Sequence, residues 1–229
     1  MKKPHSKPGD IRQSVDLRII GGKLRGSKLR YHGDRSTRPM KDRVREAIFN
    51  LVGPAVKNCH AIDLFAGTGA LGLEALSRGA SSATFIEKHV PTARIVGENI
   101  AALEMEDRSE LLTTSAFLWG KRDLPKLESE SGRPCAAEIP ACRLPLATFS
   151  RPWLTFCSPP YAFYIDRQQE LLELIVSILE SMPIGSIMVV EADGRFDFHL
   201  LPGELVEKKR SDGWDVRSYP PAVVGILRT

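Results

Sequence analysis

The chain has 229 residues, of which 42% are hydrophobic and 26% charged, and its net charge is +4. This composition is typical of a globular protein with one sizeable core and a small appendage. No segment approaches the ~18 uninterrupted apolar residues of a membrane span, and the basic N-terminus has no apolar segment behind it, so we expect a cytoplasmic protein without a secretory signal.

Positive charge is concentrated in the N-terminal part of the sequence. Residues 1–45 hold 14 Lys and Arg against four Asp, a net charge of +10, so the rest of the chain sums to −6. A basic arm on an acidic body is typical of a protein that binds a phosphate backbone. Within this arm, residues 1–16 offer little to bury and are predicted to be a disordered basic tail.

Residues 17–53 are predicted to form a hairpin followed by a helix. Two short strands, 17–20 and 28–31, are joined by a glycine-rich turn, and the helix opens at Arg38 and ends at Gly53. Three arginines of this segment lie off the apolar stripe of the helix. We expect them to contact nucleic-acid phosphates: Arg38, Arg43 and Arg45.

Residues 54–229 are predicted to form an α/β domain, because apolar strands alternate with helices and imply a largely parallel sheet covered on both faces. The strands are expected at 61–65, 83–87, 110–114, 153–157, 186–191, 204–208 and 223–227, and the helices at 71–78, 91–103 and 166–181. Residues 120–150 interrupt this pattern with four prolines. They are predicted to be a surface loop insertion, and the sequence does not indicate its function.

A glycine loop follows the first strand of this domain. Residues 67–72 read Gly-Thr-Gly-Ala-Leu-Gly and match G-x-G-x-x-G between a strand and a helix. Glu87 lies 20 residues after Gly67, at the end of the next strand, where a carboxylate can bind both ribose hydroxyls of a nucleoside cofactor. This motif alone also suits a nicotinamide or flavin cofactor.

Asp63, at the end of the strand before the glycine loop, distinguishes between these cofactors. A carboxylate there would repel a negatively charged pyrophosphate, whereas S-adenosylmethionine carries a positive ammonium and a positive sulfonium. Asp63, Phe65, Gly67 and Gly69 together with Glu87 therefore favour S-adenosylmethionine. The alternative is a helix-capping aspartate beside glycines that serve packing only.

Ser158-Pro159-Pro160-Tyr161 follows an apolar strand, at the carboxyl edge where open α/β sheets bind ligands. An exocyclic amine on a base ring is a poor nucleophile because its lone pair is delocalised, so it needs acceptors that hold its hydrogens. Ser158 and the Pro159 carbonyl are predicted to accept them, and Tyr161 to stack on a flipped base. No general base is required, since the amine becomes acidic once methylated. The alternative is an ordinary Pro-Pro turn beside a core tyrosine.

Four blocks of the sequence resemble those of one known family. They are Arg18–Lys23 with Gly26–Leu29, Thr37–Pro39, Asp42–Asn50 and Asp63–Ala80. The chain resembles the RsmD family, the 16S ribosomal RNA guanine-N2 methyltransferases. The resemblance is close over residues 18–119 and looser from there through Tyr161 to the end.

The resemblance implies a class I S-adenosylmethionine-dependent methyltransferase fold, Rossmann-like, with a seven-stranded mixed sheet and an N-terminal extension that grips RNA or covers the cofactor. It implies cofactor contacts at Asp63, Gly67, Gly69 and Glu87, and it places Ser115 where the adenine amino group is held. The expected activity is methyl transfer to the N2 amine of a guanine in 16S ribosomal RNA, on the small subunit or its assembly intermediate. We expect no metal site, since none of the four cysteines form a C-x-x-C pair. We also expect a monomer.

The sequence departs from the family pattern at three places. Ser158 stands where the family usually has Asp, Ser115 stands where it usually has Asp or Asn, and the insertion at 120–150 is longer than typical. Ser-Pro-Pro-Tyr is also the form used by some cytosine-N4 DNA methyltransferases. Two alternatives therefore stay open: an amino-methyltransferase that acts on cytosine or adenine, and a non-catalytic RNA-binding or ribosome-assembly protein. A dehydrogenase is disfavoured by Asp63.

Overall fold

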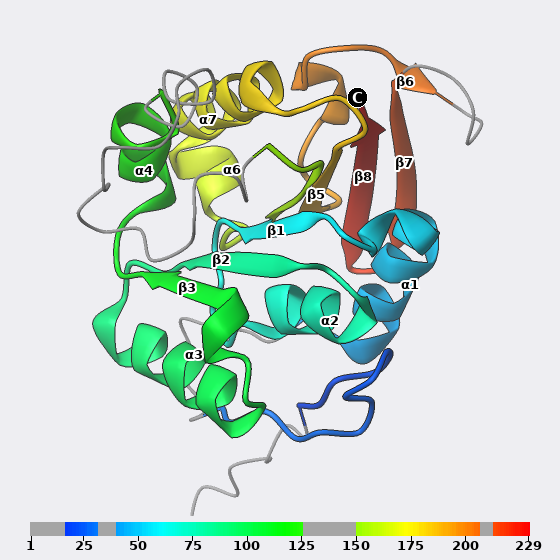
Figure 1. Ribbon diagram of the computed structural model, residues 1–229. Coiled ribbons are helices and arrows are strands. Elements are labelled where there is room, and N and C mark those ends of the chain that lie inside the picture. The colour runs from blue at the N-terminus through cyan, green and yellow to red at the C-terminus, as the bar shows by residue number, and fades with distance from the viewer. Residues whose placement is uncertain (1–16, 32–39, 126–149, 207–212) are drawn as a thin grey trace, which may run out of the picture.

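A mixed sheet of eight strands forms the centre of the computed structural model, which describes residues 17–31, 40–125, 150–206 and 213–229 (Figure 1). The strand order is β3-β2-β1-β4-β5-β8-β7-β6. Their bounds are β1 His60–Asp63, β2 Ser82–Ile86, β3 Ser109–Leu112, β4 Trp153–Cys157, β5 Ile187–Asp193, β6 Leu205–Val206, β7 Trp214–Tyr219 and β8 Ala222–Arg228.

The strands from β3 to β5 run parallel, and the chain reverses its direction of travel across the sheet at β1. It adds β2 and β3 on one side of β1, then returns to add β4 and β5 on the other. Strand β8 lies antiparallel between β5 and β7. The carboxyl ends of β1 and β4 therefore form a topological switch point, which is where open α/β sheets bind ligands.

Helices cover both faces of the sheet, so each face has its own apolar core. One face carries α1 Asp42–Val52, α2 Ala70–Arg78 and α3 Val90–Ala102, and the other carries α4 Ala116–Arg122, α6 Phe163–Asp166 and α7 Gln168–Ser181 (Figure 1). Short 3-10 turns lie at Gly53–Val56, Glu106–Arg108 and Phe198–Leu200. Within the part of the chain that the structure describes, no helix is long and apolar enough to cross a bilayer.

The structure confirms the α/β class and the predicted order of strands and helices, with three corrections. The sheet has eight strands instead of seven, because the sequence does not predict β7 at Trp214–Tyr219, while the strand expected at 204–208 corresponds to β6 at the edge. The sequence does not predict helix α4, which has only seven residues. The helix expected at 166–181 is divided at Arg167, whose φ of −136° and ψ of 29° are not helical.

The N-terminal segment, residues 17–31, is tied to α2 by hydrogen bonds. Its expected two strands are reduced to a single antiparallel bridge between Arg18 and Lys28. The Lys23 N–H donates to the Ser77 carbonyl at 2.8 Å. Gly22 makes this approach possible, because its φ is +78° and a Cβ there would lie 2.1 Å from the Ser77 carbonyl oxygen. The segment is thus packed onto the α/β body and shares one of its two cores.

Several expectations fall on residues outside the described part of the chain. These are the tail at 1–16, the start of the first helix at Arg38, and most of the insertion at 120–150. The described helix α1 begins at Asp42 and ends at Val52, and the positive φ of 63° at its C-cap Gly53 fits the predicted glycine stop. Of the cysteines, Cys59 and Cys157 are buried free thiols, and Cys135 and Cys142 lie outside the described residues.

Candidate active site

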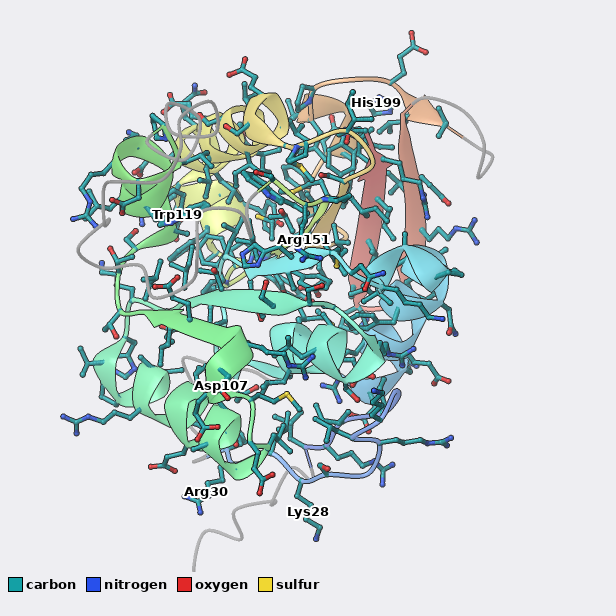
Figure 2. All side chains as sticks on the ribbon, viewed as in Figure 1. Lys28, Arg30, Asp107, Trp119, Arg151 and His199 are labelled. Atoms are coloured by element: carbon teal, nitrogen blue, oxygen red, sulfur yellow. The ribbon has the colours of Figure 1, made fainter. Side chains whose placement is uncertain are left out.

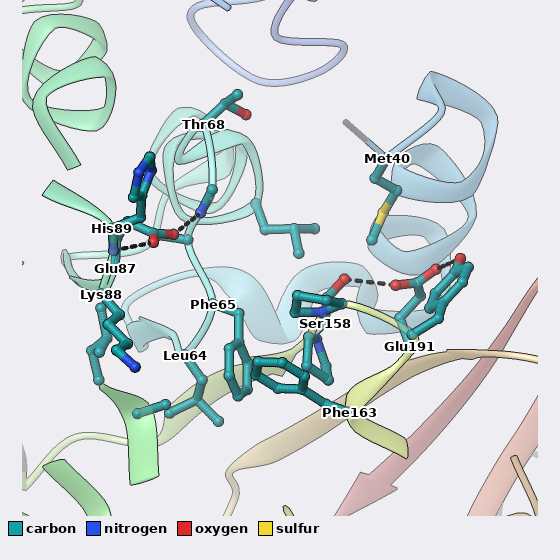
Figure 3. Close-up of a pocket in the computed structure, with 18 of the residues that line it drawn as sticks. Met40, Leu64, Phe65, Thr68, Glu87, Lys88, His89, Ser158, Phe163 and Glu191 are labelled. Carbon is teal, nitrogen blue, oxygen red and sulfur yellow. Dashed lines mark hydrogen bonds between the residues drawn. The ribbon is translucent and has the colours of Figure 1, made fainter. Parts of the chain in front are cut away.

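The switch point opens into a cavity of about 800 Å³ (Figure 3). Most of the residues predicted for the site line it: Phe65, Gly67, Glu87, Ser115, Ser158, Pro159 and Tyr161. The start of α1 borders the same cavity through Met40 and Lys41, and the turn between β7 and β8 contributes Pro221. The two sequence motifs, which are far apart in the chain, therefore meet at one place because β1 and β4 are neighbours in the sheet.

The glycine loop between β1 and α2 is held by Glu87, which follows β2. The Glu87 carboxylate accepts hydrogen bonds from the Gly67 N–H at 3.0 Å and from the His89 N–H at 2.8 Å (Figure 3). Gly67 and Gly69 have φ angles of 55° and 78°, which side chains rarely adopt. The loop can therefore turn tightly and present its backbone to the cavity.

Asp63, the last residue of β1, lies beneath this loop and is 1% exposed. One carboxylate oxygen accepts from the Gly72 N–H at 3.2 Å, and the other, Oδ1, has no hydrogen-bond partner among the described residues. Burial raises the pKa of Asp63 to about 7, against the lowering effect of the Gly72 amide. Asp63 Oδ1 is buried, the Phe65 amide also acts on this carboxylate, and Asp63 and Gly69 support the loop without lining the cavity.

The Ser-Pro-Pro-Tyr loop follows β4 and turns toward a carboxylate on β5. Ser158 Oγ donates to Glu191 Oε2 at 2.6 Å, and the Tyr161 hydroxyl donates to Glu191 Oε1 at 2.5 Å (Figure 3). Glu191 is 5% exposed and also lines the cavity. Ser158 and Tyr161 are half-buried there, so the predicted acceptor and the predicted stacking ring lie on the same wall.

Ser115 and a group of aromatic rings form the wall of the cavity nearest α4. Ser115 directly precedes α4 and lines the cavity. Phe65, Phe117 and Phe163 contact one another with ring centroids 5.8 to 6.1 Å apart. The Arg167 guanidinium lies 3.9 Å from the centroid of Phe117. This wall offers flat apolar surfaces on which a planar ring can stack.

The three arginines predicted to contact phosphate differ in position. Arg38 lies outside the described residues. Arg43 is exposed on α1 and donates to the Pro220 carbonyl, at the rim near Pro221. Arg45 is fully buried, which corrects the prediction that it contacts phosphate.

Arg45 instead joins the N-terminal segment to the body. Its Nη2 donates to the Arg18 carbonyl at 2.6 Å and to Asp42 at 2.8 Å, and its Nε lies 3.8 Å from the buried carboxylate of Glu74 on α2. Burial lowers the pKa of Arg45, and the nearby carboxylates oppose this. The pattern of charges in the sequence does not distinguish a buried arginine from an exposed one. The sequence alone therefore could not show that Arg45 is unable to contact phosphate.

Sequence reasoning missed Glu191, Phe117, Phe163 and Arg167 at this cavity. Glu191 left one signal, since it is an acidic residue near the end of an otherwise apolar strand, the position that Asp63 and Glu87 also take. Phe117 and Phe163 come from α4 and α6, which the sequence does not predict, and Arg167 lies at the break between α6 and α7. Among the described residues, no group of three His, Cys, Asp or Glu side chains is arranged to hold a metal ion.

Comparisons with known proteins place this geometry in context. Residues 17–123 match the family described as conserved hypothetical protein 95. Ribosomal RNA small subunit methyltransferase D of Escherichia coli (strain K12) is 47% identical over 105 residues, which cover 45% of this chain and 50% of that protein. The chain thus spans about half the length of the curated relatives that it matches.

Solved structures resemble nearly the whole fold. A hypothetical protein from Thermus thermophilus has a TM-score of 0.64 at 24% identity, covering 93% of this chain and 99% of that one. An RNA methyltransferase from Salinibacter ruber, solved with S-adenosyl-L-homocysteine, has a TM-score of 0.50 at 14% identity, covering 83% and 92%. The fold is therefore the one that these solved structures share, and residues 17–123 resemble the conserved hypothetical protein 95 family and ribosomal RNA small subunit methyltransferase D.

Proposed function

We propose that this chain transfers a methyl group from S-adenosylmethionine to the exocyclic N2 amine of a guanine in 16S ribosomal RNA. One observation carries the proposal: the glycine loop after β1 and the Ser-Pro-Pro-Tyr loop after β4 line the same cavity at the switch point. Each loop suits one of the two reactants, so their meeting is what a methyl transfer requires. The similarity of residues 17–123 to ribosomal RNA small subunit methyltransferase D supports the choice of ribosomal RNA.

The residues around the glycine loop fit S-adenosylmethionine. The buried carboxyl group of Asp63 beneath the loop favours a positively charged ligand over a pyrophosphate. Glu87 lines the cavity where ribose hydroxyls would lie, and Phe65 and Ser115 lie on the aromatic wall where adenine would stack. When bound, this cofactor supplies an electrophilic methyl group on a sulfonium. The backbone of Gly67 lines the cavity without a side chain and leaves room for it, whereas Gly69 lets the loop pack closely on Val96 and Leu73.

The wall formed by Ser158, Pro159 and Tyr161 is suited to the target amine. The Ser158 hydroxyl donates its only proton to Glu191, so its lone pairs are available to accept from an amine. The Pro159 carbonyl offers a second acceptor. Two acceptors hold the two amine hydrogens and leave the nitrogen lone pair directed at the methyl group. Tyr161 lines the cavity and its hydroxyl is held by Glu191, which supports a role for its ring in stacking on a flipped base.

A basic surface on the N-terminal segment supports RNA as the substrate. Lys23, Arg25, Lys28 and Arg30 are exposed, and Figure 2 shows Lys28 and Arg30 projecting from this segment at the end of the molecule below α3. Arg43 extends the basic residues toward the cavity rim. Such side chains suit phosphate contacts that position an RNA without reading its bases. A ribosomal substrate implies a cytoplasmic location, where ribosomes assemble.

The direct test is methyl transfer to small ribosomal subunits from a bacterial strain that lacks its own family member. Purified protein is incubated with methyl-labelled S-adenosylmethionine, and the labelled nucleotide is mapped by nuclease digestion and mass spectrometry. We expect label on one guanine N2, and none on subunits from a strain that retains its methylase. Label on cytosine or adenine would support the alternative amino-methyltransferase, and RNA binding without transfer would support the non-catalytic alternative. Parallel reactions with naked RNA and assembly intermediates identify the form of the substrate.

A further inference from the structure

Glu191 is a buried carboxylate for which the proposed function has so far named no role of its own. It lies on β5, beside β4, and its two oxygens accept from Ser158 and Tyr161. No cationic side chain among the described residues forms an ion pair with it, and the charge that acts on it is a second carboxylate, Asp193. A buried carboxylate without a cationic partner costs free energy. Such groups are concentrated at functional sites.

The direction of the Ser158 hydrogen bond restricts what the hydroxyl can do. A serine hydroxyl has one proton to donate and two lone pairs that accept. Because the carboxylate of Glu191 is a pure acceptor, it fixes the proton of Ser158 on the side away from the substrate. The hydroxyl can then only accept from a ligand, which selects an N–H donor and disfavours a carbonyl at the same position.

We propose that Glu191 is a positioning residue that makes Ser158 an obligatory acceptor for the target amine and takes up, through Ser158, the proton that the amine releases. This inference rests on the proposed function. It assigns to β5 the carboxylate that the family usually carries at the position of Ser158. Ser158 and Glu191 together would thus perform the function of the single aspartate that the family usually has at the position of Ser158.

The proton transfer balances without a further reactant. As the amine nitrogen bonds to the methyl carbon, the carbon–sulfur bond breaks and its electron pair remains on sulfur. The nitrogen, now positive, gives a proton to Ser158 Oγ, while the proton of Ser158 passes to Glu191 Oε2 over the 2.6 Å hydrogen bond. The products are a neutral secondary amine, a thioether, an intact serine and a protonated Glu191, which returns its proton to solvent before the next turnover.

The surroundings of Glu191 favour this role. Burial raises the pKa of Glu191, and the hydrogen bonds that it accepts only partly oppose the shift. The titratable groups that face it are Tyr161, Cys157 on β4, Tyr164 on α6, and Asp193 on its own strand. All four are acids, so none supplies a positive charge that would weaken the carboxylate as a proton acceptor.

The test compares Glu191→Gln with Glu180→Gln, a matched change at an exposed glutamate on α7. In E191Q, we expect kcat to fall at least about 100-fold, the usual size of a general-base contribution, while the KM for RNA and the Kd for S-adenosylmethionine change less than about twofold. Wild-type kcat should decrease at acidic pH as Glu191 becomes protonated, and E191Q should lack this decrease. E180Q should match the wild type in every measurement.

A double-mutant cycle tests whether Glu191 acts through Ser158. If it does, S158A/E191Q should be no slower than the slower single variant, since both changes interrupt one path. Multiplied losses would overturn the proposed path, as would an E191Q enzyme with wild-type kcat and pH profile. Thermal unfolding of each variant checks folding, and a loss of kcat that accompanies an equal loss of cofactor affinity would show a purely structural role. If the wild type itself methylates no RNA, the proposed function fails and this inference with it; an active wild type beside an equally active E191Q overturns the inference alone.

Discussion

The two sides of the cavity hold their carboxylates in different ways. On the cofactor side, at the ends of β1 and β2, Glu87 accepts from the backbone amides of Gly67 and His89. On the target side, at β4 and β5, Glu191 accepts from the side chains of Ser158 and Tyr161. A backbone partner is set by the path of the chain and survives most substitutions, whereas a side-chain partner can change when another residue compensates. The target side is therefore the one where this chain can depart from the pattern of the family that it resembles.

The largest effect is expected behind the cofactor side, where Arg45 joins α1 to Glu74 on α2. Arg45→Met removes a buried charge that is bonded to other groups, and it should lower the free energy of unfolding by about 3–5 kcal/mol. Urea unfolding followed by circular dichroism measures this. Arg43→Met, on the exposed side of the same helix, is the control and should stay within about 0.5 kcal/mol. Equal effects of the two changes would show that the buried network does not brace this side.

Removing an acid of the cofactor side should weaken cofactor binding and leave the target side intact. Asp63→Ala and Glu87→Ala should each weaken binding of S-adenosylmethionine by about 1–3 kcal/mol, because a charge-assisted contact is lost. Isothermal calorimetry measures both, with Ser158→Ala as the control that should bind the cofactor normally. Wild-type affinity in both acid variants would contradict the assignment of the cofactor side.

Changes on the target side should show the opposite pattern. Tyr161→Ala should weaken RNA binding by about 1–3 kcal/mol through lost stacking, while cofactor affinity stays constant. Tyr161→Phe keeps the ring and loses only the hydrogen bond to Glu191, so it should bind RNA nearly as well as the wild type. Ser158→Ala should slow methyl transfer with little change in either affinity. An RNA affinity that falls equally in the Ala and Phe variants would exclude stacking.

The pH dependence of cofactor binding provides a smaller effect, through Asp63. Its pKa is raised to about 7, and a positive ligand favours the ionised form, so affinity should rise between about pH 6 and 8 by at most ~1.4 kcal/mol per pH unit. The stability of the protein without ligand should change with pH in the opposite direction. The folded state binds the proton more tightly than the unfolded state does, so this group's contribution to stability is lost as pH rises toward 7. Calorimetry and thermal unfolding should show neither trend in Asp63→Asn.

The smallest expected effect belongs to Arg43 at the cavity rim. Arg43→Ala should reduce the slope of log K for RNA binding against log salt by about one unit if Arg43 contacts one phosphate. Filter binding at several salt concentrations measures the slope. Arg217→Ala, at a half-buried surface arginine that is paired with Asp215 on β7, is the control that should leave the slope unchanged. An unchanged slope for Arg43→Ala would restrict phosphate contacts to the N-terminal segment and to residues outside the described part.

Much of the site could be predicted from the sequence because its parts are local. The glycine loop, Glu87 and the Ser-Pro-Pro-Tyr loop each follow an apolar strand within a few residues, and periodicity identifies such strands. No role could be assigned to Glu191 from the sequence, because the role of an acid within a strand depends on which residues of the neighbouring strand contact it. The prediction that no general base is required stays untested, and the Glu191→Gln experiment decides it. Arg45 was misassigned for a related reason: its partners come from Arg18 and Glu74, which are distant in sequence.

The sequence by itself determined the α/β class, the order of most elements, and the two loops that a nucleoside cofactor and a base amine would need. These features depend on hydrophobic periodicity and on glycine and proline conformations, which act over a few residues. Only the tertiary structure decided that β1 and β4 are neighbours, that Arg45 is buried, and that Glu191 binds Ser158. Burial and side-chain pairing depend on which distant segments pack together, and no local pattern specifies that.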